Sequence, residues 1–437
     1  MTPMKQITVV MLLVLSGMSR AQELRAGDVL SDKNWQLAKD LMPPEILRHY
    51  ERGEYANAIF EWKPGMQRWP KAFVEGTRQN AETLRLDAKG NVVESTTGKL
   101  PTYICGFPFP NVTADDPDAG LKILWNHYFA WWNNGNLRNY VEVHWVSDKG
   151  VERTATQDVY YLYYQGQPRE FIPPHNPDDL LTQFLATTVK PADLNGTASL
   201  GWRYRAPDKR DSVWAYVPAL RRVRAVSPTN RSDGFLGSDM SQDDGPFFDG
   251  KPQDFVWKLA GEQDVLRLVD PASLAGVQYR FKLPNGGWRG VFRKIPMVGF
   301  QDPTWKGSRW APLNFGLARR HVWIIEGTPK DTYYLFGKIQ LFIDKETYQG
   351  AYNRKFDWSG NLVNTYNVFA DLNGSGGDGD DDFYGAGTIV YQGAENLKLN
   401  RATVITAPVA NGDPPNDRRI QLDPQFFASQ ALVRFGK

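Results

Sequence analysis

Cysteine is almost absent from this sequence: Cys105 is the single one among 437 residues. An intramolecular disulfide is therefore excluded, and stability must come from a large core, which a chain of this length can bury. An excess of one charge is also missing, because 51 Lys and Arg stand against 49 Asp and Glu. This balance gives no reason to expect a nucleic acid or another polyanion as partner. Beyond the N-terminal region no apolar run approaches the roughly 18 residues of a membrane-spanning helix, so we expect none.

Motifs of nucleophilic, metal and nucleotide chemistry are missing too. The five histidines lie far apart, and none belongs to a His-Glu-x-x-His pair. The sequence has no Gly-x-Ser-x-Gly elbow, no Walker loop and no Gly-x-Gly-x-x-Gly after a strand. We therefore expect a protein that is not an enzyme and that needs no cofactor.

The first 21 residues predict a secretory signal peptide. Lys5 is followed by an apolar run from Ile7 to Leu15, and Ser19-Arg20-Ala21 has the small-x-small pattern of a cleavage site. The apolar run is too short to anchor the chain stably in a bilayer. Because no cysteine stands at the cleavage site, we expect no lipid anchor on the mature N-terminus. The mature chain, 22–437, is expected to be exported.

Aromatic residues are abundant, with 15 Trp, 19 Tyr and 23 Phe. From about Tyr140 onward, short aromatic and β-branched segments bounded by Gly, Pro, Asn or Asp predict about eleven antiparallel strands. The segment Tyr334–Ile343 places apolar side chains on both of its faces, which indicates a sheet covered on both sides or curled around an apolar cavity. The expected fold is mainly β, with a single large, strongly curved antiparallel sheet or half-open barrel.

Two segments carry helical periodicity. One is Asp32–Gly53, interrupted at Pro43-Pro44, and the other is Asp116–Asn136. We expect an N-terminal helical segment of about 30–138 before the strand-rich remainder, within a single domain.

Seven aromatic residues lie on separate predicted strands and are candidates to line an apolar cavity. The alternative for each is ordinary core packing. The candidates are Trp202, Trp214, Tyr216, Trp257, Trp323, Tyr334 and Phe342.

The stretch Asp211–Gly245 predicts a hairpin, with a strand Val213–Val217 turning near Pro218 into Arg222–Val226. Arginines and aspartates follow one another closely in it, and a structural cluster of helix caps and ion pairs is the favoured interpretation. A metal-binding or acid–base role for the aspartates is the alternative. The residues of this predicted cluster are Arg222, Arg224, Arg231, Asp239, Asp243 and Asp244.

An acidic loop later in the chain resembles a calcium-binding template. Asp371, Asn373, Ser375 and Asp382 fall at positions 1, 3, 5 and 12 of the template. Both flanks read as strands, whereas the template needs helices. We favour an acidic loop tip joining two strands, with Ca²⁺ as the alternative.

Several motifs that together cover most of the mature chain carry a family resemblance. They are GFPFP (106–110), DPDAGLKILWN (116–126), WAYVPALRRVR (214–224), RSDGFLGSDMSQDD (231–244), RHVWIIEGTPKD (320–331), FIDKETY (342–348) and FDWSGNLVNTY (356–366). Together they resemble the outer-membrane lipoprotein-sorting proteins, whose fold is that of the carriers LolA and LolB. The first two motifs resemble one large branch of that group, which consists of signal-bearing periplasmic proteins of unknown function, often encoded beside RND-type exporters.

The resemblance implies a LolA/LolB-like half-open barrel of antiparallel strands, with helices covering its concave face and an apolar cavity for lipid-like cargo. The expected function is that of a periplasmic binding or carrier protein for a hydrophobic, lipid-like ligand. Its expected partners are an inner-membrane RND-type exporter and an outer-membrane protein. The alternative is a structural or adaptor subunit of an envelope export complex, with no ligand of its own.

Overall fold

The computed structural model describes residues 23–227, 231–276, 280–291, 295–370, 387, 389–406 and 415–436. The predicted signal peptide and the calcium-loop candidates Asp371, Asn373, Ser375 and Asp382 lie outside these residues. Within the described ranges, no helix is long and apolar enough to cross a membrane.

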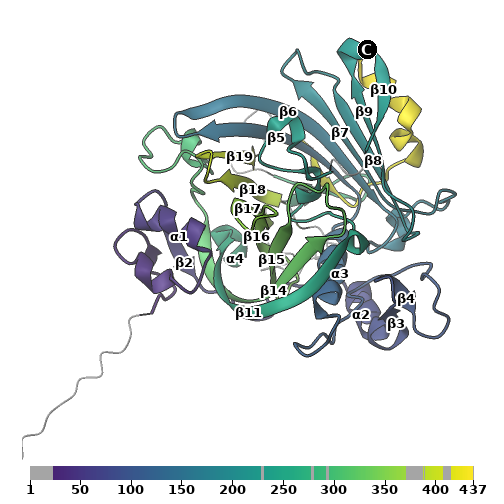
Figure 1. The fold of residues 1–437 in the computed structure, drawn as a ribbon, viewed down its shortest axis with the longest axis horizontal. Helices are drawn as coiled ribbons and strands as arrows, with labels where there is room; N and C mark the ends of the chain where they lie inside the picture. The colour runs from purple at the N-terminus through teal and green to yellow at the C-terminus, as the bar shows by residue number, and fades with distance from the viewer. Residues whose placement is uncertain are drawn as a thin grey trace, which may run out of the picture.

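One large sheet dominates the described part of the chain (Figure 1). Thirteen of its strands pair antiparallel in a continuous series from β10 to β11. In spatial order they are β10 (Arg222–Val226), β9 (Ser212–Val217), β8 (Ala198–Tyr204), β7 (Leu180–Lys190), β6 (Gly150–Tyr163), β5 (Leu137–Ser147), β19 (Arg401–Thr406), β18 (Ile389–Asn396), β17 (Leu362–Ala370), β16 (Gly350–Phe356), β15 (Lys338–Asp344), β14 (Gly316–Pro329) and β11 (Phe255–Val269).

Five short strands extend this sheet, which therefore has 18 strands within the described residues. From β5 the pairing continues through β20 (Asn416–Arg418) and β13 (Trp288–Gly290) to β12 (Arg280–Lys282). From β14 it continues through β2 (Asn57–Phe60) to β1 (Val29–Leu30), and the β14–β2 pairing is parallel. A separate hairpin joins β3 (Leu84–Leu86) to β4 (Val92–Glu94).

The predicted fold class, mainly β with a mostly antiparallel sheet, is thus confirmed, whereas the predicted strong curvature of the sheet is wrong. The sheet is neither closed nor strongly curled, and it has 18 strands instead of about eleven. The five added strands have only two to four residues, too short to show a two-residue alternation. Strand β10 lies at an edge of the sheet, where exposed Arg222 and Arg224 oppose further strand addition.

Both faces of the sheet are covered around β15, as its two-sided apolar pattern predicts. Ile339, Leu341 and Ile343 pack into a core that includes side chains of α3 (Ala119–Trp132). Phe342 points to the other face and packs in a second core with Ile46 of α1 (Pro44–Glu51). This strand is therefore covered by protein on both sides.

The helices follow the predicted segments in part. The first expected helix is split into a 3-10 turn, η1 (Trp35–Ala38), and α1, which begins at Pro44. The second is α3. A further helix, α2 (Lys71–Thr83), has no counterpart in the prediction, because few of its residues are buried and its apolar periodicity is weak. The segment of about 30–138 also carries β1 to β4, so it is not purely helical.

The remaining helices are short. Among them, η10 (Pro424–Phe427) and η11 (Ser429–Gly436) near the C-terminus lie beside β8, β9 and β10 (Figure 1). Phe427 and Leu432 pack there against Leu200 and Tyr216. The others are α4 (Pro271–Leu274), η2 (Arg169–Phe171), η3 (Pro218–Leu220), η5 (Phe235–Gly237), η6 (Gln242–Asp244), η7 (Pro252–Asp254) and η8 (Gly299–Gln301).

We expect His127 of α3 to make the fold sensitive to acid. Its Nδ1 lies 2.8 Å from the carbonyl oxygen of Tyr348, which fixes Nδ1 as the donor, and buried Nε2 has no hydrogen-bond partner among the residues that the structure describes. Burial lowers the pKa of His127 from 6.5 to about 4, so the unfolded chain binds the proton first as the pH falls. The native state should lose up to about 3 kcal/mol between pH 6.5 and pH 4 through this residue.

Urea unfolding at pH 7 and pH 4.5 measures this loss. His127→Asn keeps an N–H donor near the Nδ1 position but cannot be protonated, so its free energy of unfolding should fall less over the same pH interval. An equal fall in the variant and the unmodified protein would show that His127 does not contribute.

Candidate functional site

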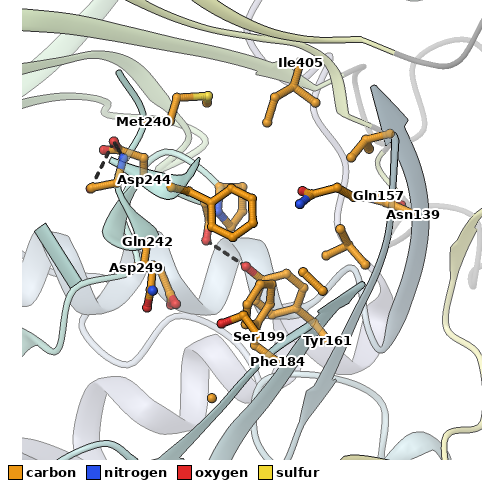
Figure 2. A pocket seen from close by; sticks show the side chains of 18 of the residues that line it. Asn139, Gln157, Tyr161, Phe184, Ser199, Met240, Gln242, Asp244, Asp249 and Ile405 are labelled. Carbon is orange, nitrogen blue, oxygen red and sulfur yellow. Dashed lines mark hydrogen bonds between the residues drawn. The ribbon is translucent and has the colours of Figure 1, made fainter. Parts of the chain in front are cut away.

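A cavity of about 160 Å³ lies between strands β5–β9 and the segment 231–249. Because side chains alternate along a strand, strands such as β5, β6 and β7 give every second residue to the cavity. On β6, Val159 and Tyr161 face the cavity, whereas Tyr160 and Leu162 pack on the opposite side with the C-terminal helices. Figure 2 shows Tyr161, Phe184 and Ser199 on one side of the space and Met240 and Ile405 across from them.

The segment 231–249 closes the cavity on the side away from the β5–β9 wall, and it contributes Phe235, Met240 and Pro246. It contains η5 and η6 and makes no long regular element. Ser241 and Asp244 form a capping box at the start of η6, in which the carboxylate of Asp244 accepts from the backbone N–H of Ser241 at 2.7 Å.

Three ion pairs fix this segment. Asp239 accepts from Arg401 of β19 at 2.9 Å, and Asp243 accepts from Arg231 at 2.6 Å. Asp244 lies 2.5 Å from Nζ of Lys355 on β16, and both side chains are almost fully buried. Burial raises the pKa of Asp244, and Lys355 opposes this change. The pairs of Asp239 with Arg401 and of Asp244 with Lys355 therefore attach the segment to the sheet, whereas the pair of Arg231 with Asp243 lies within the segment.

The predicted hairpin is present, with Val217 opposite Arg222 and Val213 opposite Val226. Of the six residues in the predicted cluster, the structure places Arg231 and Asp243 in one ion pair. Arg222 and Arg224 are exposed on the edge strand, and within the described residues they pair with none of the three aspartates. Asp239 and Asp244 instead form ion pairs with Arg401 of β19 and Lys355 of β16, which are distant in the sequence.

The aspartates do not converge on a common point, as a metal or acid–base site would require, because each has its own cation. In the part of the chain that the structure describes, no group of three or more His, Cys, Asp or Glu is placed to hold a metal ion.

The structure does not bring the seven aromatic candidates together. Trp202 is among the residues around the cavity, but its indole N–H donates to the carbonyl of Phe427 at 2.8 Å and its ring meets Trp214 edge-on. The other six belong to packed cores. Trp214 and Tyr216 pack near the C-terminal helices η10 and η11. Trp257, Trp323 and Tyr334 pack in the core that includes side chains of α3, and Phe342 packs in the core that includes Ile46 of α1.

The cavity wall also includes smaller residues that the sequence did not single out. Gly201 and Ser199 of β8, Ala186 of β7 and Val159 of β6 face it. The sequence signal that could have indicated this wall is the alternation of small and large side chains along β8. On β8, Ser199 and Gly201 alternate with Leu200 and Trp202, and small residues on one face of a strand leave space.

Charged residues form one region of the cavity wall. The guanidinium of Arg203 on β8 donates to Asp211 through Nε at 3.0 Å and Nη2 at 2.9 Å, and to Asp249 through Nη1 at 3.1 Å. Arg231 donates to Asp243 and, at 3.0 Å, to the backbone carbonyl of Asp249. Tyr334 donates its hydroxyl to Asp243 at 2.8 Å, outside the cavity lining. This network joins β8 and β9 to the segment 231–249.

The two carboxylates of this region differ in acidity. Burial alone would raise the pKa of Asp211, but Arg203 and Arg231 outweigh it and lower the pKa. For Asp249, burial raises the pKa despite the same two arginines, and Asp243 and Asp211 add to the increase. The cavity therefore combines an apolar wall with a buried, charged patch.

The sequence can now be compared with known families. The profile of a family described as proteins of unknown function, DUF1329, matches residues 29–432. The chain belongs to the DUF1329 family. The match includes both walls of the cavity, and it confirms the family resemblance inferred from the motifs. No curated protein matches this DUF1329 chain.

Solved structures are similar to this DUF1329 chain over most of its length. One is a DUF1329 family protein from Desulfovibrio piger, with 18% identity, TM-score 0.47, and coverage of 73% of this chain and 99% of that one. A putative outer membrane lipoprotein-sorting protein domain from Vibrio parahaemolyticus has 16% identity, TM-score 0.46, and coverage of 72% and 99%. A LolA superfamily protein from Nitrosomonas europaea has 12% identity, TM-score 0.40, and coverage of 71% and 97%.

Proposed function

We propose that this DUF1329 protein binds a hydrophobic, lipid-like ligand in the cavity between β5–β9 and the segment 231–249. The observation that supports it is a mostly apolar wall, with Val159, Phe184 and Met240 among its residues, in a cavity that lies between the strands and this segment. Removing apolar surface from water supplies about 25 cal/mol per Å², which needs no charge pairing with the tail of the ligand.

The size of the cavity limits how much of a ligand it encloses. At about 160 Å³ it is smaller than the roughly 300–1,000 Å³ of sites that bury a drug-sized molecule. Cavities near 150 Å³ take up a molecule such as benzene. In the described conformation the cavity therefore holds one end of a lipid-like molecule, and a longer ligand requires displacement of the segment 231–249.

The protein would act as a carrier in the periplasm, together with an envelope exporter. Support for this setting comes from the signal peptide predicted for residues 1–21 and from the sequence resemblance to lipoprotein-sorting proteins encoded beside RND-type exporters. An adaptor without its own ligand is the alternative, and it predicts a cavity that never takes up apolar molecules.

Native mass spectrometry distinguishes the two functions. Protein purified without detergent should carry an added mass that organic extraction removes, and the extracted protein should bind 1-dodecanol as a test ligand. A protein that is free of added mass and that does not bind 1-dodecanol would contradict the carrier function and favour the adaptor.

A further inference from the structure

Asp211 stands out among the charged residues of the cavity wall. It is 8% exposed, it lines the cavity, and within the described residues its Oδ1 has no hydrogen-bond partner. A buried carboxylate oxygen without a donor is costly, so a donor is expected to satisfy it in the functional state. Both hydrogen bonds from Arg203 go to the other oxygen, Oδ2.

The arginines of this patch are already engaged with protein acceptors. Arg203 uses Nε, Nη1 and Nη2 for Asp211 and Asp249, and Nη2 also donates to the carbonyl of Asp249 at 2.7 Å. Arg231 uses Nε for Asp243 and Nη2 for Asp249. The remaining Nη1 of Arg231 lies 3.6 Å from Oδ2 of Asp211. Because both arginines already face carboxylates of the protein, the patch is a poor receptor for a carboxylate or phosphate, and Oδ1 of Asp211 remains as an acceptor for a donor.

The charges of the patch leave an excess of carboxylate. Asp211, Asp243 and Asp249 stand against Arg203 and Arg231, which leaves one formal negative charge. Two further pairs of opposite charge lie nearby and add no net charge. They are Lys251 with Asp254 and Lys355 with Asp244. The raised pKa of Asp249 has the same origin, since burial and its neighbouring carboxylates outweigh the two arginines.

We propose that the ligand is an amphiphile with a protonated amine as its head group, which donates to Oδ1 of Asp211 while its apolar tail lies along Val159, Phe184 and Met240. An ammonium group has donors and no acceptor, and its charge balances the excess carboxylate. This inference rests on the proposed carrier function and specifies the class of ligand.

Three ligands with the same tail test the head group. Dodecylamine, 1-dodecanol and laurate are titrated at pH 7 into extracted protein by isothermal calorimetry. Dodecylamine should bind roughly tenfold or more tightly than 1-dodecanol, as expected for a charge-assisted hydrogen bond, and laurate should bind more weakly than both. If 1-dodecanol or laurate binds as tightly as the amine, the head-group inference is wrong but the carrier function stands. If none of the three binds, both are wrong.

The variant Asp211→Asn tests whether Asp211 causes the preference for dodecylamine over 1-dodecanol. The variant should lose the preference for dodecylamine over 1-dodecanol. Asp208→Asn is the matched control, because Asp208 is an exposed neighbour paired with Lys89 and should keep the preference. A preference that persists in Asp211→Asn would overturn the assignment. If Asp211→Asn does not fold, the comparison of the three ligands on the unmodified protein still decides the head-group inference.

Discussion

Lys355→Met is expected to lower the free energy of unfolding by about 3–5 kcal/mol. Lys355 has no exposed surface, and its Nζ lies 2.5 Å from Oδ1 of Asp244, which is 1% exposed. Removing the cation leaves a carboxylate inside the protein without its counter-charge. The donors that remain carry no charge: Ser241 donates to Oδ2, and the side-chain amide of Asn353 donates to Oδ1 at 3.5 Å. Because Asp244 is part of the segment 231–249, the same substitution should loosen the cover of the cavity.

Urea unfolding of Lys355→Met and of a surface variant measures this effect. Lys345→Met is the control, since Lys345 pairs with partly exposed Glu262 and such pairs contribute about 0–1 kcal/mol. The double variant Asp244→Leu with Lys355→Met should recover part of the loss, because it leaves no unpaired charge. A loss in Lys355→Met no larger than that in the control would show that the buried pair does not hold the segment.

Gly201→Leu is expected to weaken binding of an apolar ligand roughly tenfold or more while the fold is retained. A Cβ atom built at Gly201 would meet only Phe184, at 3.9 Å, which is an ordinary contact. Since Gly201 lines the cavity, a leucine side chain there would project into open space and occupy volume that the ligand needs. Filling a cavity with apolar atoms does not remove any existing contact of the protein.

Titration with 1-dodecanol and thermal unfolding together test this expectation. Gly201→Ala is the matched control, because a single methyl group leaves most of the 160 Å³ free and should preserve binding. Unchanged affinity in Gly201→Leu, with a melting temperature close to that of the unmodified protein, would place the ligand elsewhere.

The elements that the sequence predicted are those with strong local patterns. The hairpin of β9 and β10 follows from alternating residues on both sides of Pro218, and α3 follows from a broad apolar stripe that begins after Asp116. The covered faces of β15 follow from apolar residues at successive positions. Local sequence was sufficient in each case because the deciding contacts repeat along the element itself.

The cavity could not be predicted from the sequence, because large aromatic residues fill protein cores as readily as they line cavities. Trp214 and Tyr216 pack near the C-terminal helices, which are more than 200 residues further along the chain. The space lies on the other face of β8, where Ser199 and Gly201 are small. In the same way, Asp239 and Asp244 meet Arg401 and Lys355, and nothing in the local sequence indicates these distant partners.

The most direct test of the account is an electron-density map of protein purified without detergent or extraction. The account predicts continuous elongated density between Phe184 and Met240, with its polar end within hydrogen-bonding distance of Oδ1 of Asp211. Density at another site, or a cavity that stays empty after soaking with dodecylamine, would contradict the claim that this DUF1329 protein carries an apolar ligand beneath the segment 231–249.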